Sequence, residues 1–149
     1  MRTLWAILLG GLALVGTAEA RLGESKEQVI ERYGKPYRED VEAPWDNIIY
    51  CSKDGYKFCF MLLHGKVEFM IVMKEDGLTE ADVKIFLDKN SSGSGFVDDV
   101  NRGDGFYVEA DSGRMGIWGK DALVLVTEEG HKARTGQVKE NLKKKTDGF

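Results

Sequence analysis

The apolar residues of this chain recur first with the period of a helix and then with the period of a strand. Between residues 25 and 34 they stand at helical spacing: Val29, Ile30 and Tyr33. Ser25 precedes this stripe and Gln28 follows it by three residues, which is the capping-box signature of a helix N-terminus. Gly34 and Pro36 indicate the C-terminal end. The pattern predicts a short helix between Ser25 and Gly34.

The period then changes to two, which is the repeat of β-strands. Three segments alternate in this way and are predicted to be strands: residues 47–52, 56–63 and 66–74. Tight turns at Asp54-Gly55 and His64-Gly65 are expected to join them as hairpins. A regular two-residue loop at His64-Gly65 predicts one strongly apolar face, made of Phe58, Phe60, Leu62, Val67, Phe69 and Ile71.

A second succession of a helix and strands follows. Thr79 and Asp82 indicate another helix N-terminus, and apolar residues continue to about residue 89. Residues 90–95 are rich in Ser and Gly and are predicted to form a flexible loop. Four further segments have strand character: residues 96–100, 106–110, 114–118 and 122–127. Residues 131–149 are polar and rich in Lys, and we expect a tail or a loosely attached helix there.

The order of elements in residues 23–75 is similar to that in residues 79–127. A shift of 54 residues lays Ser25 on Thr79 and Gly65 on Gly119. The alternatives are a duplicated helix–strand–strand–strand unit and two similar strings of elements that arose separately. In either case the sequence predicts one α+β domain over residues 21–130, with short helices packed on an antiparallel sheet.

The first twenty residues have the composition of a removable export signal. Arg2 precedes an apolar run that ends at Val15, and Ala18 and Ala20 frame a cleavage site. The apolar run is shorter than the roughly twenty residues that a membrane-spanning helix needs. Because Arg21 stands where a lipoprotein would have a cysteine, we expect no lipid anchor. The sequence predicts a periplasmic or secreted protein without a transmembrane segment.

The charge of the chain excludes some partners. The formal net charge is −4 at pH 7, and 42% of the residues are hydrophobic. An acidic protein has no bulk attraction for nucleic acid, so no nucleic-acid partner is expected. The one basic run, Lys143-Lys144-Lys145, is shorter than the clusters of about four to eight that bind anionic lipid.

Cys51 and Cys59 are the only cysteines, and an exported protein favours a disulfide over free thiols. The loop between them decides whether they meet. A two-residue loop at Asp54-Gly55 puts the two sulfurs on opposite faces of the hairpin, whereas a three-residue loop that includes Tyr56 sets them directly opposite each other. A Cys51–Cys59 disulfide and two buried thiols both remain open. Their spacing fits no zinc or redox motif.

Catalytic patterns are not recognisable in the sequence. Neither His64 nor His131 has a serine or cysteine placed beside it by a local motif, so we expect a protein without catalytic residues or cofactors. The densest cluster of oxygen ligands consists of Asp98, Asp99, Asn101, Asp104 and Glu109. Its opening resembles a calcium loop, but glycine and alanine occupy later ligand positions, so no metal site is expected.

Residues 23–36 resemble the helix signature of small bacterial envelope proteins of the SmpA/OmlA/BamE type. The signature positions, all at matching spacing, are Gly23, Ser25, Val29, Gly34 and Pro36. The segments 45–50 and 63–67 are similar to the strands that follow in that family. The resemblance covers residues 23–75 and implies a short helical layer on an antiparallel sheet. The β-lactamase inhibitor proteins carry this fold in tandem, which is similar to the two units expected here.

The chain departs from that family in two respects. The assembly-machinery lipoproteins have an acylated N-terminal cysteine, which is replaced here by Arg21, and they lack a second half like residues 79–127. The resemblance therefore implies the scaffold and not the barrel-assembly role. The whole chain is more similar to exported bacterial proteins of uncharacterised role that begin with this helix.

The predicted hairpin has a second face that is only half polar. With regular pairing that face carries Cys59, Met61, Met70 and Val72, and Trp118, which lies beside the turn at Gly119-Lys120, is a further contact candidate. We therefore expect a non-enzymatic protein–protein interaction module of the bacterial envelope that binds an envelope protein through these residues. The alternative is a calcium- or metal-binding protein or a small enzyme that uses Asp98, Asp99 and Asp104.

Overall fold

The computed structural model describes residues 21–147, and the predicted export signal at residues 1–20 lies outside this range. The elements in chain order are α1 (Lys26–Tyr33), β1 (Arg38–Asp40), β2 (Asn47–Lys53), β3 (Tyr56–Leu63), β4 (Lys66–Lys74), α2 (Glu80–Asn90), β5 (Val97–Asp98), β6 (Phe106–Val108), β7 (Met115–Trp118), β8 (Ala122–Val126) and α3 (Glu128–Thr146). The predicted α+β class is confirmed.

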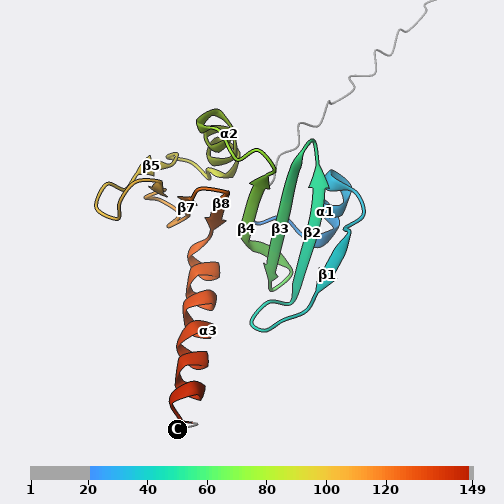
Figure 1. Cartoon of the computed structure of the whole chain (residues 1–149), viewed down its shortest axis with the longest axis vertical. Helices are drawn as coiled ribbons and strands as arrows, with labels where there is room; N and C mark the ends of the chain where they lie inside the picture. Colours follow the sequence, from blue (N-terminus) through green and yellow to red (C-terminus); the bar gives the residue numbers. More distant parts are fainter. Residues whose placement is uncertain (1–20, 148–149) are drawn as a thin grey trace, which may run out of the picture.

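The eight strands form one sheet in the order β1-β2-β3-β4-β8-β7-β6-β5, and every neighbouring pair is antiparallel (Figure 1). The two halves of the chain meet where β4 pairs with β8. Each half contributes one helix followed by four strands. This arrangement suits a duplicated unit, and the duplication itself stays a prediction.

The edge strand β1 is the element that the sequence did not predict. Its three residues, Arg38, Glu39 and Asp40, are all charged, so the strand has no apolar alternation. All three charges are paired, Arg38 with Asp40 and Glu39 with Lys26. Charged side chains on an edge strand discourage pairing with a strand of another chain.

Both predicted capping boxes are present. The Ser25 hydroxyl accepts from the backbone N–H of Gln28 at 3.3 Å, and the Gln28 side chain accepts from the Ser25 N–H at 2.8 Å. At α2, Thr79 and Asp82 bond in the same reciprocal way. Asp82 also accepts from the Tyr56 hydroxyl, and this bond, together with Thr79 and nearby Lys74, lowers the pKa of Asp82 to about 2.

Removing the first cap is expected to weaken α1. Ser25→Ala leaves one backbone donor without its partner and should cost about 1 kcal/mol of folding free energy. The denaturant midpoint measures this loss. Ser94→Ala, in an exposed loop, is the matched control and should leave the midpoint unchanged. An equal midpoint in both variants would contradict the role of Ser25 as the N-cap.

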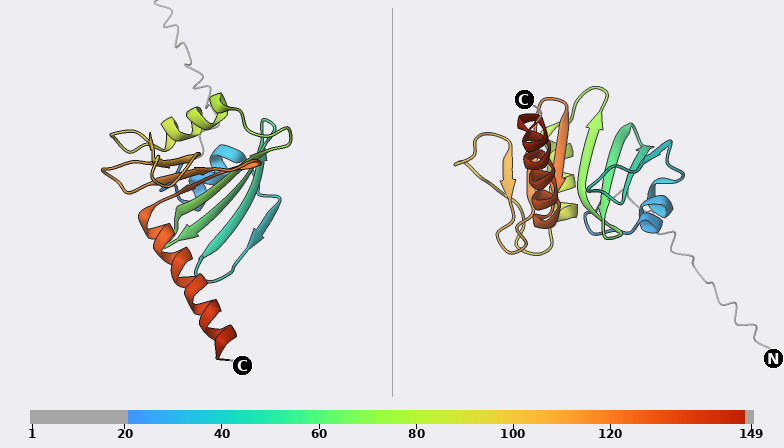
Figure 2. Two further views of the ribbon diagram at one scale, coloured as in Figure 1. Left: turned by 60° about the vertical axis from the view of Figure 1, so that its left-hand side comes forward. Right: turned by 90° about the horizontal axis from the view of Figure 1, so that it is seen from below.

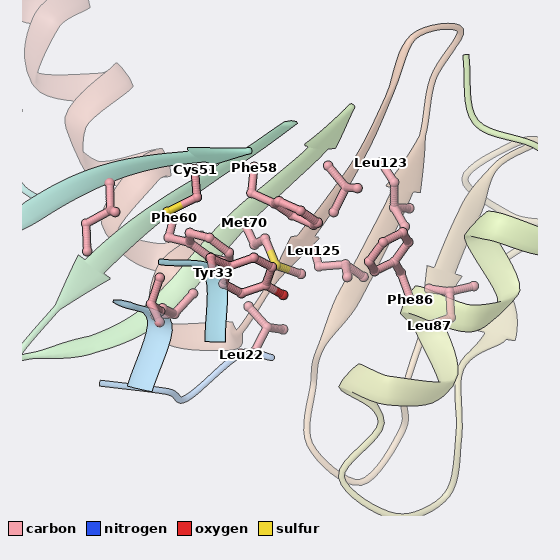
Figure 3. Close-up of a cluster of buried hydrophobic side chains, with 14 of the residues drawn as sticks. Leu22, Tyr33, Cys51, Phe58, Phe60, Met70, Phe86, Leu87, Leu123 and Leu125 are labelled. Atoms are coloured by element: carbon pink, nitrogen blue, oxygen red, sulfur yellow. The ribbon is translucent and has the colours of Figure 1, made fainter. Parts of the chain in front are cut away.

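The main core lies on the sheet face that α1 and α2 cover. Figure 3 shows Tyr33 from α1 and Phe86 from α2 pointing toward strand residues that include Phe58, Phe60 and Leu125. The rings of Phe58 and Phe60 are stacked with centroids 5.7 Å apart. These strand side chains are fully buried, so the main core is continuous across the junction of the two halves.

The pairing of β3 with β4 departs from the regular register. Leu62 pairs with Val67 as predicted, but the next pair is Met61 with Phe69, which leaves Glu68 as an extra residue on β4. Such a β-bulge shifts the strand by one residue and so exchanges the faces of every later side chain. Phe69 therefore lies on the opposite face from the one predicted.

The prediction that Met70 and Val72 share a face with Cys59 and Met61 is consequently wrong. Met70 and Val72 are fully buried in the main core, while Ile71 takes the place predicted for them. Cys59 and Met61 remain on the other side, which we call the second face of the sheet.

The Cys51–Cys59 disulfide is not formed. Cys51 pairs with Phe58 and Cys59 with Tyr50, which is the register of the two-residue loop at Asp54-Gly55. Cys51 therefore points into the main core and Cys59 into the second face, and both thiols are free. Burial raises the pKa of each thiol to about 11, so they behave as small apolar side chains.

The predicted tail is a long helix, α3, that starts directly after β8 and extends past the ends of the strands (Figures 1 and 2). Its first turn is anchored on the bulge. The Glu68 carbonyl accepts from the Thr127 N–H at 3.0 Å, and the Thr127 hydroxyl caps the helix by accepting from the Gly130 N–H at 3.0 Å. Gly130 is required there because a Cβ atom would collide with the Glu68 carbonyl oxygen.

Candidate functional site

The second face of the sheet is covered over the first half of the chain. Trp45, Ile48 and Cys59 are buried there. Trp45 reaches over the strands from the loop before β2 and lies against Phe69, with ring centroids 5.8 Å apart. Ala133 of α3 packs on the same cluster. Two predicted binding residues, Cys59 and Met61, therefore belong to a small second core rather than to a free surface.

A hydrogen bond from α3 to the loop before β2 closes this side. The Gln137 side-chain amide donates to the Ala43 carbonyl at 2.6 Å. Together with the first-turn contacts to Glu68, this bond fixes α3 across the second face. As a result α3 separates a covered part of that face, over β2 and β3, from an uncovered part over β8, β7 and β6.

The uncovered part forms an apolar groove of about 450 Å³ beside α3, which we call the α3 groove. Its floor is made by side chains of β4, β8, β7 and β6: Phe69, Val124, Val126, Ile117, Met115 and Phe106. Thr135 and Val138 of α3 form one wall, and Arg102 stands at the other. Ile117 is 36% exposed and Val138 is 48% exposed, so apolar atoms face solvent on both sides.

Two arginines and one histidine line the rim of the α3 groove. Arg102 pairs with Asp99 at 3.2 Å and also contacts the Met115 sulfur. His131 and Arg134 reach the groove from α3, and within residues 21–147 the Arg134 side chain makes no ion pair or hydrogen bond. The groove can therefore take apolar side chains and place a negative charge at its edge.

Trp118 lies away from the α3 groove. Successive residues of a strand point to opposite faces, so Ile117 lines the groove while Trp118 packs against the main core. The backbone N–H of Trp118 donates to the Gly105 carbonyl at 2.8 Å. The expectation that Trp118 shares one contact surface with Cys59 and Met61 is wrong.

A larger hollow of about 940 Å³ lies on the main-core side, between α2 and the strands β5 and β6. It is open, and its polar lining carries both signs of charge. Lys84 and Asp88, which line it, already pair with each other at 2.7 Å. The α3 groove, with its apolar floor and single sign of charge, is the better binding site.

The acidic cluster proposed as a metal site is divided by the fold. Glu109 is fully buried and faces the loop after α2, whereas Asp98 is exposed and Asp99 pairs with Arg102. Within residues 21–147 no three His, Cys, Asp or Glu side chains come together in a way that could hold a metal ion. The geometry does not favour the metal-binding alternative built on Asp98, Asp99 and Asp104.

The loop predicted to be a flexible linker instead encloses the Glu109 carboxylate. Backbone N–H groups of Ser92, Gly93 and Gly95 donate to it at 2.9, 3.2 and 3.1 Å. The hydroxyls of Ser91, Ser92 and Ser112 donate as well. The Ser and Gly residues that suggested flexibility are thus the donors of an ordered anion-binding loop.

These donors decide the charge state of Glu109. Burial alone would raise the pKa of this carboxyl, but hydrogen bonds from Ser112, Ser91 and Ser92 outweigh burial and hold it well below its usual range. Glu109 is therefore ionised at neutral pH and ties the loop after α2 to the end of β6, which it directly follows. Its role in the fold is structural.

Comparison of the chain with protein-family models, curated proteins and solved structures finds no match. No helix within residues 21–147 is both long and apolar enough to cross a bilayer.

Proposed function

We propose that this protein is a non-enzymatic interaction module that binds an apolar segment of a partner protein in the α3 groove. The observation that carries the proposal is the uneven covering of the second face. Over β2 and β3 that face is covered by Trp45 and Ala133, while over β8, β7 and β6 apolar side chains such as Ile117 stay open to solvent. Open apolar surface beside a polar rim is typical of a contact site.

The size of the α3 groove suits a few side chains of a partner. A volume of about 450 Å³ lies within the range of about 300–1,000 Å³ that is typical of pockets that bury most of a ligand's surface. The floor is rigid because it is a four-strand part of the sheet, and one wall is fixed by the Gln137–Ala43 hydrogen bond. A preformed groove loses little entropy when it binds.

The proposed place of action is the bacterial envelope. The export-signal composition of residues 1–20 and the resemblance of residues 23–75 to the SmpA/OmlA/BamE type support it. A non-enzymatic role is supported by the position of the histidines. His64 lies in the β3–β4 turn, and His131 lies at the groove wall without a hydrogen-bonded side-chain partner among the described residues.

Photo-crosslinking tests the groove in the cells that make the protein. A benzophenone side chain at position 117 should form an adduct with a partner protein, because Ile117 lies on the groove floor. The same group at position 85 is the matched control, since Ile85 is 52% exposed on α2. Val138→Glu should abolish the adduct from position 117. Equal adducts from both positions, or none from 117, would contradict the proposed function.

A further inference from the structure

The apolar wall of the α3 groove continues beyond the sheet along α3. His131, Thr135, Val138 and Leu142 follow one another at spacings of four, three and four residues, which places them on one side of a helix. The first three line the groove, and Leu142 stands one turn beyond Val138, 59% exposed. We call these four residues the α3 stripe.

The charges on α3 are distributed unevenly around this stripe. Its acids are already paired, Glu128 with Lys132 and Glu140 with Lys144, both at 2.9 Å. These ion pairs leave other cations of the helix free to meet a partner.

Arg134, Lys139 and Lys145 make no ion pair within residues 21–147. Arg134 precedes Val138 by one turn, while Lys139 and Lys145 stand three residues before and after Leu142. Residues three and four apart are neighbours on a helix surface, so these three cations border the α3 stripe.

We infer that the occupant of the α3 groove is an acidic amphipathic helix of a partner protein, which packs its apolar side on the α3 stripe and sets its carboxylates against Arg134, Lys139 and Lys145. This inference rests on the proposed function. A helix fits because the spacing of the stripe is the one that two packed helices share. Unpaired cations around an apolar strip select acidic flanks on the partner.

A membrane surface is a poorer match for the same features. Helices that lie on a bilayer bury a broad apolar face, whereas the exposed apolar residues of α3 are only Val138 and Leu142. The clustered basic residues Lys143, Lys144 and Lys145 are fewer than lipid-binding clusters have, and Lys144 is paired with Glu140. An acidic protein helix is therefore the occupant that the geometry favours.

Two synthetic peptides test the inference by fluorescence anisotropy with the mature chain, residues 21–149. Both carry leucines at coiled-coil spacing, and their flanking positions are all Glu in one peptide and all Lys in the other. At low ionic strength the Glu peptide should bind about tenfold more tightly than the Lys peptide, and added salt should reduce this preference.

Charge reversal provides the sharper comparison. The triple variant R134E/K139E/K145E should invert the preference and bind the Lys peptide more tightly. The control K35E/K57E/K120E changes the net charge equally at exposed positions that lie outside α3 and outside the strand end that anchors it, and it should keep the preference for the Glu peptide. Equal changes in both triple variants would mean that net charge decides, which would overturn the inference.

The remaining outcomes separate the inference from the proposed function. Equal binding of the two peptides, or binding of neither, overturns the acidic helix. Binding of the chain to phosphatidylglycerol vesicles that R134E/K139E/K145E abolishes, without a peptide preference, overturns it in favour of a membrane. If position 117 still forms its groove-dependent adduct in these cases, the proposed function stands while the inference fails.

Discussion

Met70→Lys is expected to unfold the protein at neutral pH. Met70 has no solvent exposure and lies in the main core near Phe60 and Leu125 (Figure 3). A buried ammonium group without a partner costs several kcal/mol, and domains of this kind are stable by only about 5–15 kcal/mol. Far-UV circular dichroism and thermal melting measure the loss.

The same variant tests the β-bulge at Glu68. Met73→Lys is the matched control because Met73 lies on the same strand, on the second face, and is only half-buried. It should melt close to the wild type, while Met70→Lys should show no cooperative transition. In the regular register that the sequence predicts, Met70 would lie on the second face. A Met70→Lys protein that stays folded would therefore support the regular register and contradict the bulge at Glu68.

The bulge shows what the local pattern could not predict. Both registers of β4 place apolar residues on both faces, because residues 69–73 are apolar without interruption. The register that β4 adopts is favoured by a contact from a distant part of the sequence. The hydroxyl of Thr127, 59 residues away, donates to the carbonyl of Glu68. Caps and turns, by contrast, depend on neighbouring residues. The caps at Ser25 and Thr79 and the position of the turn at Asp54-Gly55 are therefore predicted correctly, while the length of that loop stays open in the sequence.

The candidate site was harder to predict than the fold. Two of the five predicted contact residues, Met70 and Val72, lie in the main core because of the one-residue shift, and Trp118 packs against the same core. The groove that the structure shows depends on where α3 crosses the sheet, and α3 has a weakly apolar sequence. The sequence does contain one signal for a contact surface on β8. Residues 122–126 are apolar at every position, which indicates a strand that presents apolar side chains on both faces of the sheet.

The composition of the loop after α2 predicts the wrong structure for a related reason. Ser and Gly at residues 91–95 have the composition of a linker, yet the same residues supply hydroxyls and unhindered N–H groups to an anion. The anion is Glu109, which is 14 residues or more along the chain. No local pattern connects the donors with their acceptor, so only the folded chain reveals the pair.

Glu109→Gln is expected to destabilise the protein by about 3 kcal/mol or more at neutral pH. The amide keeps the shape of the side chain, but its NH₂ group is a donor and cannot accept from the N–H and hydroxyl donors around it. Hydrogen bonds to a charged acceptor contribute about 1.5–3 kcal/mol each, and unsatisfied buried donors add a further cost. Urea denaturation measures the loss, with Glu31→Gln on the exposed side of α1 as the control.

The pH dependence of this loss identifies the charge as its cause. Because the folded pKa of Glu109 lies below the ordinary value of 4.5, the ionised carboxylate stabilises the fold fully above that value. Its contribution is lost as the pH falls toward the folded pKa. The stability difference between the wild type and Glu109→Gln should thus be constant from about pH 6 to 7 and shrink below about pH 4. A difference that stays the same from pH 7 to pH 3.5 would mean that the loop after α2 recognises the shape of Glu109 and not its charge.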